Sequence, residues 1–169
     1  MATLYTIVNP AGQVVTTFAC RQNALDKPGY TEMPDTDPRW QAYLTGQANA
    51  ALIAYANAKQ ATLLAAVYSH PLSDGSATLT TACDAGSLTG LNSLTQWATT
   101  PALNASVPTR TYFNADWSAH PVTPAQMTEF AVAIGAHVQS LYGDLAAVIA
   151  AIIAGTLTTT AQIDAASWS

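Results

Sequence analysis

Residues 123–154, TPAQMTEFAVAIGAHVQSLYGDLAAVIAAIIA, decide the fold because they carry the clearest local signals for a long helix. Thr123 can cap the helix, Pro124 suits its first position, and Gln126 completes a capping box. Gly155 is the expected stop. Between these ends, apolar residues recur at alternating gaps of four and three, which is the a/d spacing of a heptad repeat. The sequence therefore predicts one long helix whose apolar stripe has to be covered by other elements.

The large residues of this stripe are the candidate packing and interface residues of the chain: Met127, Ile134, Val138, Leu141, Leu145, Val148 and Ile152. The flanking positions Phe130, Tyr142 and Ile149 are also apolar, so the face is too wide for a two-stranded coiled coil. We expect a bundle of three or more helices, including one from residues 47–69. Small residues also recur at four-residue steps, which indicates either close approach of a second helix or ordinary alanine-rich packing: Gly143, Ala147, Ala151 and Gly155.

The N-terminal part predicts a small β unit. Residues 3–19 have the alternation of a hairpin with a turn at residues 9–12, and a third strand is expected around residues 30–33. Three strands in under 40 residues bury too little surface to be stable alone, so we expect the unit to dock on something else. A helix follows from Pro38, with Gly46 as a possible interruption, and it is expected to end at His70-Pro71.

The middle of the chain predicts short elements. We expect a helix over residues 87–99 capped by Ser87, a strand over residues 109–113, and a hairpin that ends near residue 122 with Trp117 tucked beneath it. The tail predicts a final helical turn through Ile163, with Trp168 as an anchor. The fold class is therefore α+β, mainly α. Its expected parts are a β unit for docking or attachment at 1–36, a linking helix at 37–71, and a helical domain with a short hairpin at 72–169.

Low charge is the main feature of the composition. Only 9% of the residues are charged, against about 25% in average proteins, and the net charge is −5. The five Lys and Arg residues are scattered, so no basic stripe points to nucleic acid. The start of the chain has no secretion signal, and the run at residues 145–154 is too short to span a membrane. These features predict synthesis in a cytoplasm, no membrane insertion, and self-association into an oligomer.

Candidate catalytic and metal-ligating residues are few. His70 with Asp74 and His120 with Asp116 have an i, i+4 spacing, but each pair spans a proline or a turn. His137 lies beside the apolar stripe and is interpreted as a packed histidine. The cysteines, Cys20 and Cys83, form no motif and are treated as small hydrophobic residues. Because no nucleophile elbow or phosphate loop is present, we expect no enzyme activity, no metal and no cofactor.

Several short motifs of the C-terminal half occur together. They are Asp116-Trp117, His120-Pro121 and Val122-Thr123 before the long helix, and 153–156 (IAGT), 162–166 (QIDAA) and Trp168 after it. This succession resembles a domain of unknown function that is widespread in bacteriophage and prophage tail genes, beside tail-fibre and tail-fibre-assembly reading frames. The resemblance covers about residues 60–169, and the stretch DTDPRWQAYL at 35–44 is similar to the lead segments of such proteins.

The resemblance implies a structural component of a phage tail, such as a tail fibre, baseplate or fibre-attachment protein. Such a protein would be made in the host bacterial cytoplasm, reside in the virion tail, and contact other phage tail proteins and copies of itself. One alternative is a tail-fibre assembly chaperone that is not retained in the virion. Another is a host-binding adhesin module that grips a glycan through Trp40, Trp97, Trp117 or Tyr112. The resemblance assigns no catalytic or binding residues.

Overall fold

The structure, a computed structural model, describes residues 3–18 and 28–168. Cys20, Arg21 and Lys27 lie outside these residues. The chain divides into two compact units, Met1–Ala54 and Tyr55–Ser169, and the boundary falls inside the first helix. The class is α+β and mainly α, as predicted, with a three-stranded sheet first and a long helix near the C-terminus.

The first unit contains the predicted small sheet. Strands β1 (Thr3–Val8), β2 (Val14–Phe18) and β3 (Tyr30–Pro34) pair antiparallel in the order β2-β1-β3. The expected turn closes the hairpin, with the N–H of Gly12 donating to the Asn9 carbonyl at 2.8 Å. Within the described part of this unit the fully or nearly buried side chains are few: Thr6, Val14 and Met33.

Helix α1 (Pro38–Ala65) begins at the proline predicted to start it and runs through Gly46 without interruption. The prediction that it continues to residue 69 is wrong. Residues Val67–Pro71 form strand β4, which pairs antiparallel with β5 (Thr78–Ala82). Val67 and Tyr68 favour a strand, and the hairpin partner supplies the backbone hydrogen bonds that a further helical turn would have made. The segment at 37–71 therefore holds a helix and a strand.

Helix α4 (Pro124–Ile153) is the helix that the opening stretch predicts. Both halves of the capping box are present, since Thr123 accepts from the N–H of Gln126 and the Gln126 side chain accepts from the N–H of Thr123. The helix ends before Gly155, where the N–H of Thr156 donates to the Ala151 carbonyl at 2.9 Å.

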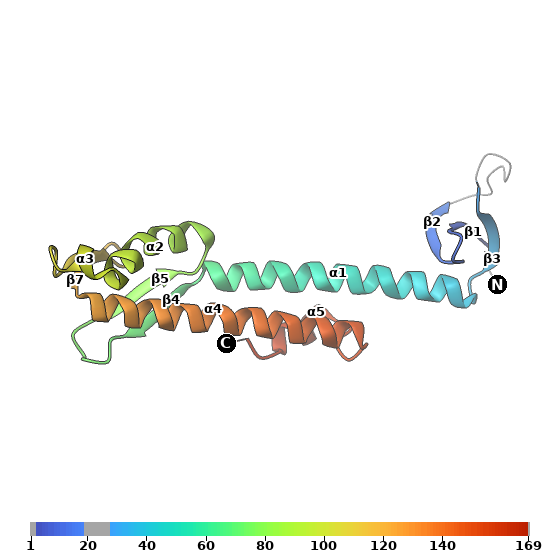
Figure 1. The fold of residues 1–169 in the computed structure, drawn as a ribbon. Coiled ribbons are helices and arrows are strands. Elements are labelled where there is room, and N and C mark those ends of the chain that lie inside the picture. The colour runs from blue at the N-terminus through green and yellow to red at the C-terminus, as the bar shows by residue number, and fades with distance from the viewer. Residues whose placement is uncertain (1–2, 19–27, 169) are drawn as a thin grey trace. The chain divides into compact units, whose positions relative to one another are not determined.

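The second unit has its main core around the first half of α4 (Figure 1). Helix α2 (Ala85–Thr99), helix α3 (Pro101–Asn104) and two hairpins surround it. The second hairpin is formed by β6 (Arg110–Phe113) and β7 (Ala119–Val122), as expected. The predicted cap at Ser87 is wrong by three residues, because Asp84 accepts from the N–H of Ser87 at 2.9 Å and α2 begins earlier. A carboxylate is the stronger acceptor at this position.

The second half of α4 lies alongside the later part of α1 (Figure 1). Gln60 is buried between them and donates to the carbonyl of Leu141 at 3.3 Å. The tail then folds back as α5 (Thr160–Ala165), capped by Thr159, and buries Ile163. A helical cluster of α1, α4 and α5 therefore continues from the mixed core.

Candidate functional site

The apolar stripe of α4 faces the protein's own interior. Six of its seven candidate packing residues are no more than 8% exposed: Met127, Ile134, Leu141, Leu145, Val148 and Ile152. The seventh, Val138, is half-buried against the main core. The flanking Phe130 is also buried, but Tyr142 is 53% exposed, so the expectation of a buried face that includes Tyr142 is wrong. The stripe provides packing within one chain, and its role between chains stays a prediction.

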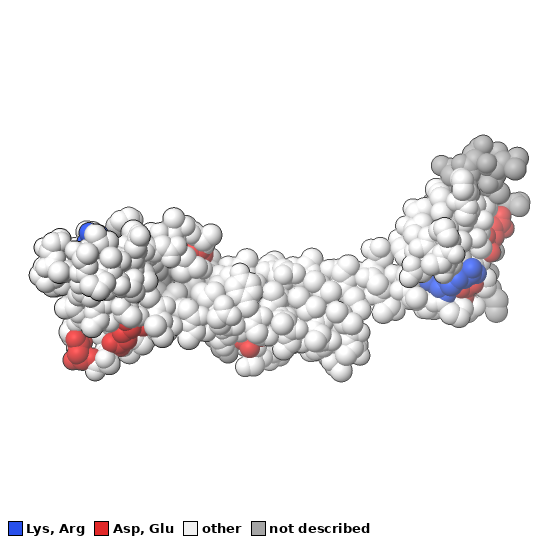
Figure 2. Space-filling view, in the orientation of Figure 1, with Lys and Arg blue, Asp and Glu red and all other residues white. Residues whose placement is uncertain are grey.

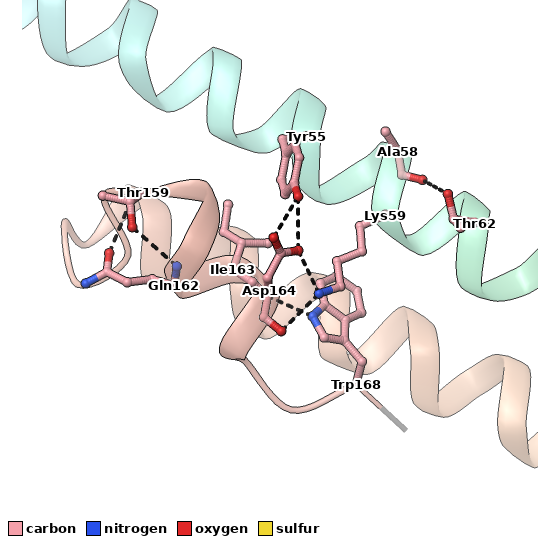
Figure 3. Close-up of polar contacts among 9 residues, drawn as sticks. All are labelled: Tyr55, Ala58, Lys59, Thr62, Thr159, Gln162, Ile163, Asp164 and Trp168. Carbon is pink, nitrogen blue, oxygen red and sulfur yellow. Dashed lines mark hydrogen bonds and ion pairs between the residues drawn. The ribbon is translucent and has the colours of Figure 1, made fainter.

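A polar cluster fastens α5 and the tail to α1 (Figure 3). The Tyr55 hydroxyl donates to Asp164 Oδ2 at 2.8 Å, and Lys59 Nζ donates to Asp164 Oδ1 at 2.9 Å. Lys59 also lies 5.5 Å from the ring centre of Trp168, whose indole N–H donates to the Ile163 carbonyl. The Lys59 and Tyr55 hydrogen bonds hold the pKa of Asp164 below its usual value. Trp168 therefore lies against this cluster, in keeping with its expected role as an anchor.

Some of the small residues that recur at four-residue steps in α4 pack against other parts of the same chain. Ala147 and Ala151 line a hollow of about 330 Å³ together with residues of the segment that follows the helix and of the tail. Gly143, in contrast, is exposed, and a Cβ built on it would meet nothing within 4 Å. The strip therefore splits, with its later positions facing the chain's own tail and Gly143 open to solvent.

The outward face of α4 carries a second heptad pattern, which we call the outer seam: Val132, Ala136, Gln139, Gly143, Ala146, Ala150 and Ile153. All seven positions are exposed, with Val132 at 68% and Ile153 at 66%. The first six positions, from Val132 to Ala150, each precede a residue of the buried stripe by two, which is about 200° around a helix of 3.6 residues per turn. None carries a charge. The sequence reading missed this seam because alanine and glycine do not stand out in a hydrophobic pattern, although the four-and-three spacing is present.

The surface as a whole is also poor in charge. Figure 2 shows Lys, Arg, Asp and Glu side chains in a few small groups, with most of the visible face free of them. By length and composition alone, α4 is also apolar enough to cross a membrane, and only 17% of its most apolar window of 18 residues is buried. The outer seam, which carries no charge and exposes Val132 and Ile153, is therefore a candidate contact surface.

The histidines make local contacts in the second unit. His70 Nε2 lies 3.2 Å from Glu129 Oε1, and the same carboxylate accepts from the N–H and hydroxyl of Ser73 at 2.7 and 2.9 Å. His120 lies beside the Ser118 hydroxyl, and the His137 ring stacks on Tyr68 with centres 4.5 Å apart. Within residues 3–18 and 28–168, no group of three or more His, Cys, Asp and Glu residues is placed to hold a metal ion.

A groove of about 550 Å³ lies between α2, β5 and the β6–β7 turn, and we call it the aromatic groove. Phe113 and Trp117 line it, and they are 56% and 81% exposed. The expectation that Trp117 is tucked beneath the hairpin is therefore wrong. The N–H of Trp117 donates to the Asn114 carbonyl at 2.9 Å, which places the residue third in a three-residue loop and turns its side chain outward.

The other aromatic candidates lie elsewhere. Trp97 and Tyr112 are buried in the core, where the Trp97 indole N–H donates to the Val107 carbonyl and the Tyr112 hydroxyl donates to the Thr80 carbonyl. Trp40 is half-buried in the first unit and stacks on Tyr43. Of the four residues named for a binding role from the sequence, Trp117 alone is freely exposed.

Comparison with known proteins supplies one family. Residues 47–167 match the family described as a domain of unknown function, DUF4376, which extends further toward the N-terminus than the resemblance seen in the sequence. Neither the curated proteins nor the solved structures contain a significant match. Because the family match spans most of the chain, from the first third of α1 to the tail beyond α5, the protein belongs to the DUF4376 family.

Proposed function

We propose that the protein is a structural component of a bacteriophage tail that works by assembling with copies of itself and with neighbouring tail proteins. The placement in a tail rests on the resemblance of its C-terminal motifs to proteins of phage tail genes. The observation that carries the assembly role is the outer seam of α4, an uncharged heptad pattern that the chain itself leaves uncovered.

The outer seam has the dimensions and chemistry of a helix–helix contact. From Val132 to Ile153 it runs about 30 Å along the helix, at 1.5 Å per residue. Exposed helix faces in water normally carry charged side chains, whereas this face offers methyl groups, one glycine and one amide. Small residues allow two helix backbones to approach closely.

A second copy of the same chain is the occupant that we favour. An uncharged face does not require a partner of opposite charge, so an identical face on a second copy can pack against it. Closed symmetric assemblies of identical chains are also the commonest kind of oligomer. A lipid bilayer is the competing occupant, but Glu129 in the first half of α4 is held by Ser73 of the protein's own hairpin, and the opposite stripe is covered by α1 and α2.

The test introduces a charge into the outer seam. We expect the wild-type chain to sediment as a multiple of 17.6 kDa and Ala146→Glu to sediment as a monomer, because association would bury an unpaired carboxylate. The control Ala102→Glu places the same charge on an exposed residue of α3, away from the seam, and should leave the mass unchanged. Both positions are exposed, so each change should alter folding stability by under about 0.5 kcal/mol.

Two results would overturn the assembly role. One is a monomeric wild-type chain at every concentration, and the other is an unchanged oligomer in Ala146→Glu. Flotation with phosphatidylcholine vesicles distinguishes membrane binding from self-association. A protein whose outer seam binds lipid would float with the vesicles and would be monomeric in buffer.

Residence in the virion is tested separately. A structural tail protein should appear in purified virions at a fixed ratio to the other tail proteins, as measured by quantitative mass spectrometry. An assembly chaperone would be absent or far below that ratio, and this result would replace the structural role with the chaperone role.

A further inference from the structure

The aromatic groove is neutral throughout. Its twelve lining residues include no Asp, Glu, Lys, Arg or His. Leu91 and Leu94 contribute apolar surface, and Thr80, Thr81 and Ser87 contribute hydroxyl groups. A charged ligand would lose its hydration here without gaining an ionic partner, so the lining selects for an uncharged ligand.

The wall that carries the two exposed rings is held in place before any ligand arrives. Asn114 is buried and accepts from the N–H of Thr80 at 2.9 Å, while its amide donates to the Thr78 carbonyl at 3.2 Å. The N–H of Ala115 donates to the Thr80 hydroxyl, and the Tyr112 hydroxyl donates to the Thr80 carbonyl. These bonds tie the β6–β7 turn to β5, so the turn needs little ordering on binding.

Trp117 occupies a position that folding alone does not favour. Its φ is 65°, and among the described residues it is the one non-glycine residue with a positive φ. The third position of such a loop commonly holds glycine, because a bulky side chain in the left-handed region is strained. The ring does not recover this cost by burial, since it is 81% exposed. Strain kept at an exposed aromatic residue points to a role in binding.

We propose that the aromatic groove binds a neutral saccharide. A sugar ring offers a face of C–H groups, which packs on the exposed faces of Phe113 and Trp117, and an edge of hydroxyl groups. The Thr80 hydroxyl accepts from the N–H of Ala115 and keeps its own proton for donation. The hydroxyls of Thr81 and Ser87 donate within the chain and keep an acceptor position, so all three can pair with that edge. A short apolar peptide would pack on the rings but would not use these remaining hydrogen-bonding positions, so the saccharide is the better complement.

The experiment titrates the full-length ¹⁵N-labelled chain with maltotetraose and with tetra-N-acetylchitotetraose. The protein has four tryptophans, so the indole N–H signal of Trp117 can be assigned by its loss in Trp117→Gly. We expect at least one sugar to shift this signal and the backbone signals of residues 113–118 saturably, with a dissociation constant of about 1 mM. Trp117→Gly and Phe113→Ala should each weaken binding about tenfold or more.

The variants keep the result interpretable. Glycine suits the φ of Trp117, so Trp117→Gly should fold, and its melting temperature checks this. Trp40→Phe, which changes a tryptophan of the first unit, should bind as the wild type does. The proposal is overturned if neither sugar shifts the Trp117 signal, if Trp117→Gly binds equally well, or if the shifts are centred on another tryptophan. The Ala146→Glu variant should retain sugar binding, so failure of the assembly role would leave this result intact.

Discussion

At the scale of the residue, Gly29 is a position where both the backbone conformation and the surrounding space require glycine. Its φ is +80°, and a Cβ built on it would come within 2.3 Å of the Val8 carbonyl oxygen. The Gly29 carbonyl also accepts from the N–H of Val8 at 2.9 Å, so the two backbones cannot separate without losing a hydrogen bond. Glycine is therefore required here for both conformation and space.

We expect Gly29→Ala to destabilise the first unit by more than about 2 kcal/mol, from the left-handed strain together with the steric clash. The matched change Gly12→Ala has nearly the same φ, +79°, but open space around the new methyl group, so it should cost only about 1 kcal/mol. Urea denaturation, monitored by hydrogen exchange at the β1 amides, measures the loss of stability in both variants. Equal costs would show that the backbone shifts to relieve the clash.

At the scale of the element, α4 has a buried stripe and exposed positions beside it, and a charge should destabilise the fold much more on the stripe. Leu141 is 1% exposed and Tyr142, the next residue, is 53% exposed. Leu141→Asp should destabilise the second unit by about 3–5 kcal/mol, because the carboxylate is buried without a partner. Tyr142→Asp should cost under about 1 kcal/mol. Chemical denaturation at low protein concentration compares the two, and an unchanged denaturation midpoint for Leu141→Asp would contradict the packing described above.

At the scale of the whole molecule, exposed carboxylates with local hydrogen bonds set the response to acid. The pKa values of Glu129 and Asp74 are lowered by hydrogen bonds from Ser73 and Ser76, and that of Asp164 by bonds from Lys59 and Tyr55. The unfolded chain therefore binds protons at a higher pH than the folded chain does. Stability should be fully present above about pH 4, the usual carboxyl pKa, and fall as the pH drops through the lowered values.

Thermal melts from about pH 7 to about pH 3 measure this loss. Glu129→Gln should make the melting temperature less dependent on pH, since an amide does not titrate and the lowered pKa of Glu129 is removed with its carboxylate. Each exposed group contributes little by itself, so the expected change is a shallower acid slope. An identical slope in Glu129→Gln would remove this carboxylate from the explanation.

Local sequence by itself determined α4. Its capping box, Pro124, the heptad spacing and Gly155 act within a few residues of where they stand, and the same holds for the N-terminal hairpin and its Asn9 turn. The end of α1 was decided by tertiary structure, because Val67–Pro71 becomes a strand only when Thr78–Ala82 lies beside it. The exposure of Trp117 was decided in the same way, since a sequence shows that a ring is apolar but not whether a core remains to cover it. The uncovered face of α4 also depends on tertiary structure: both faces repeat at heptad spacing, and only the packing of α1, α2 and the hairpins selects which one is buried.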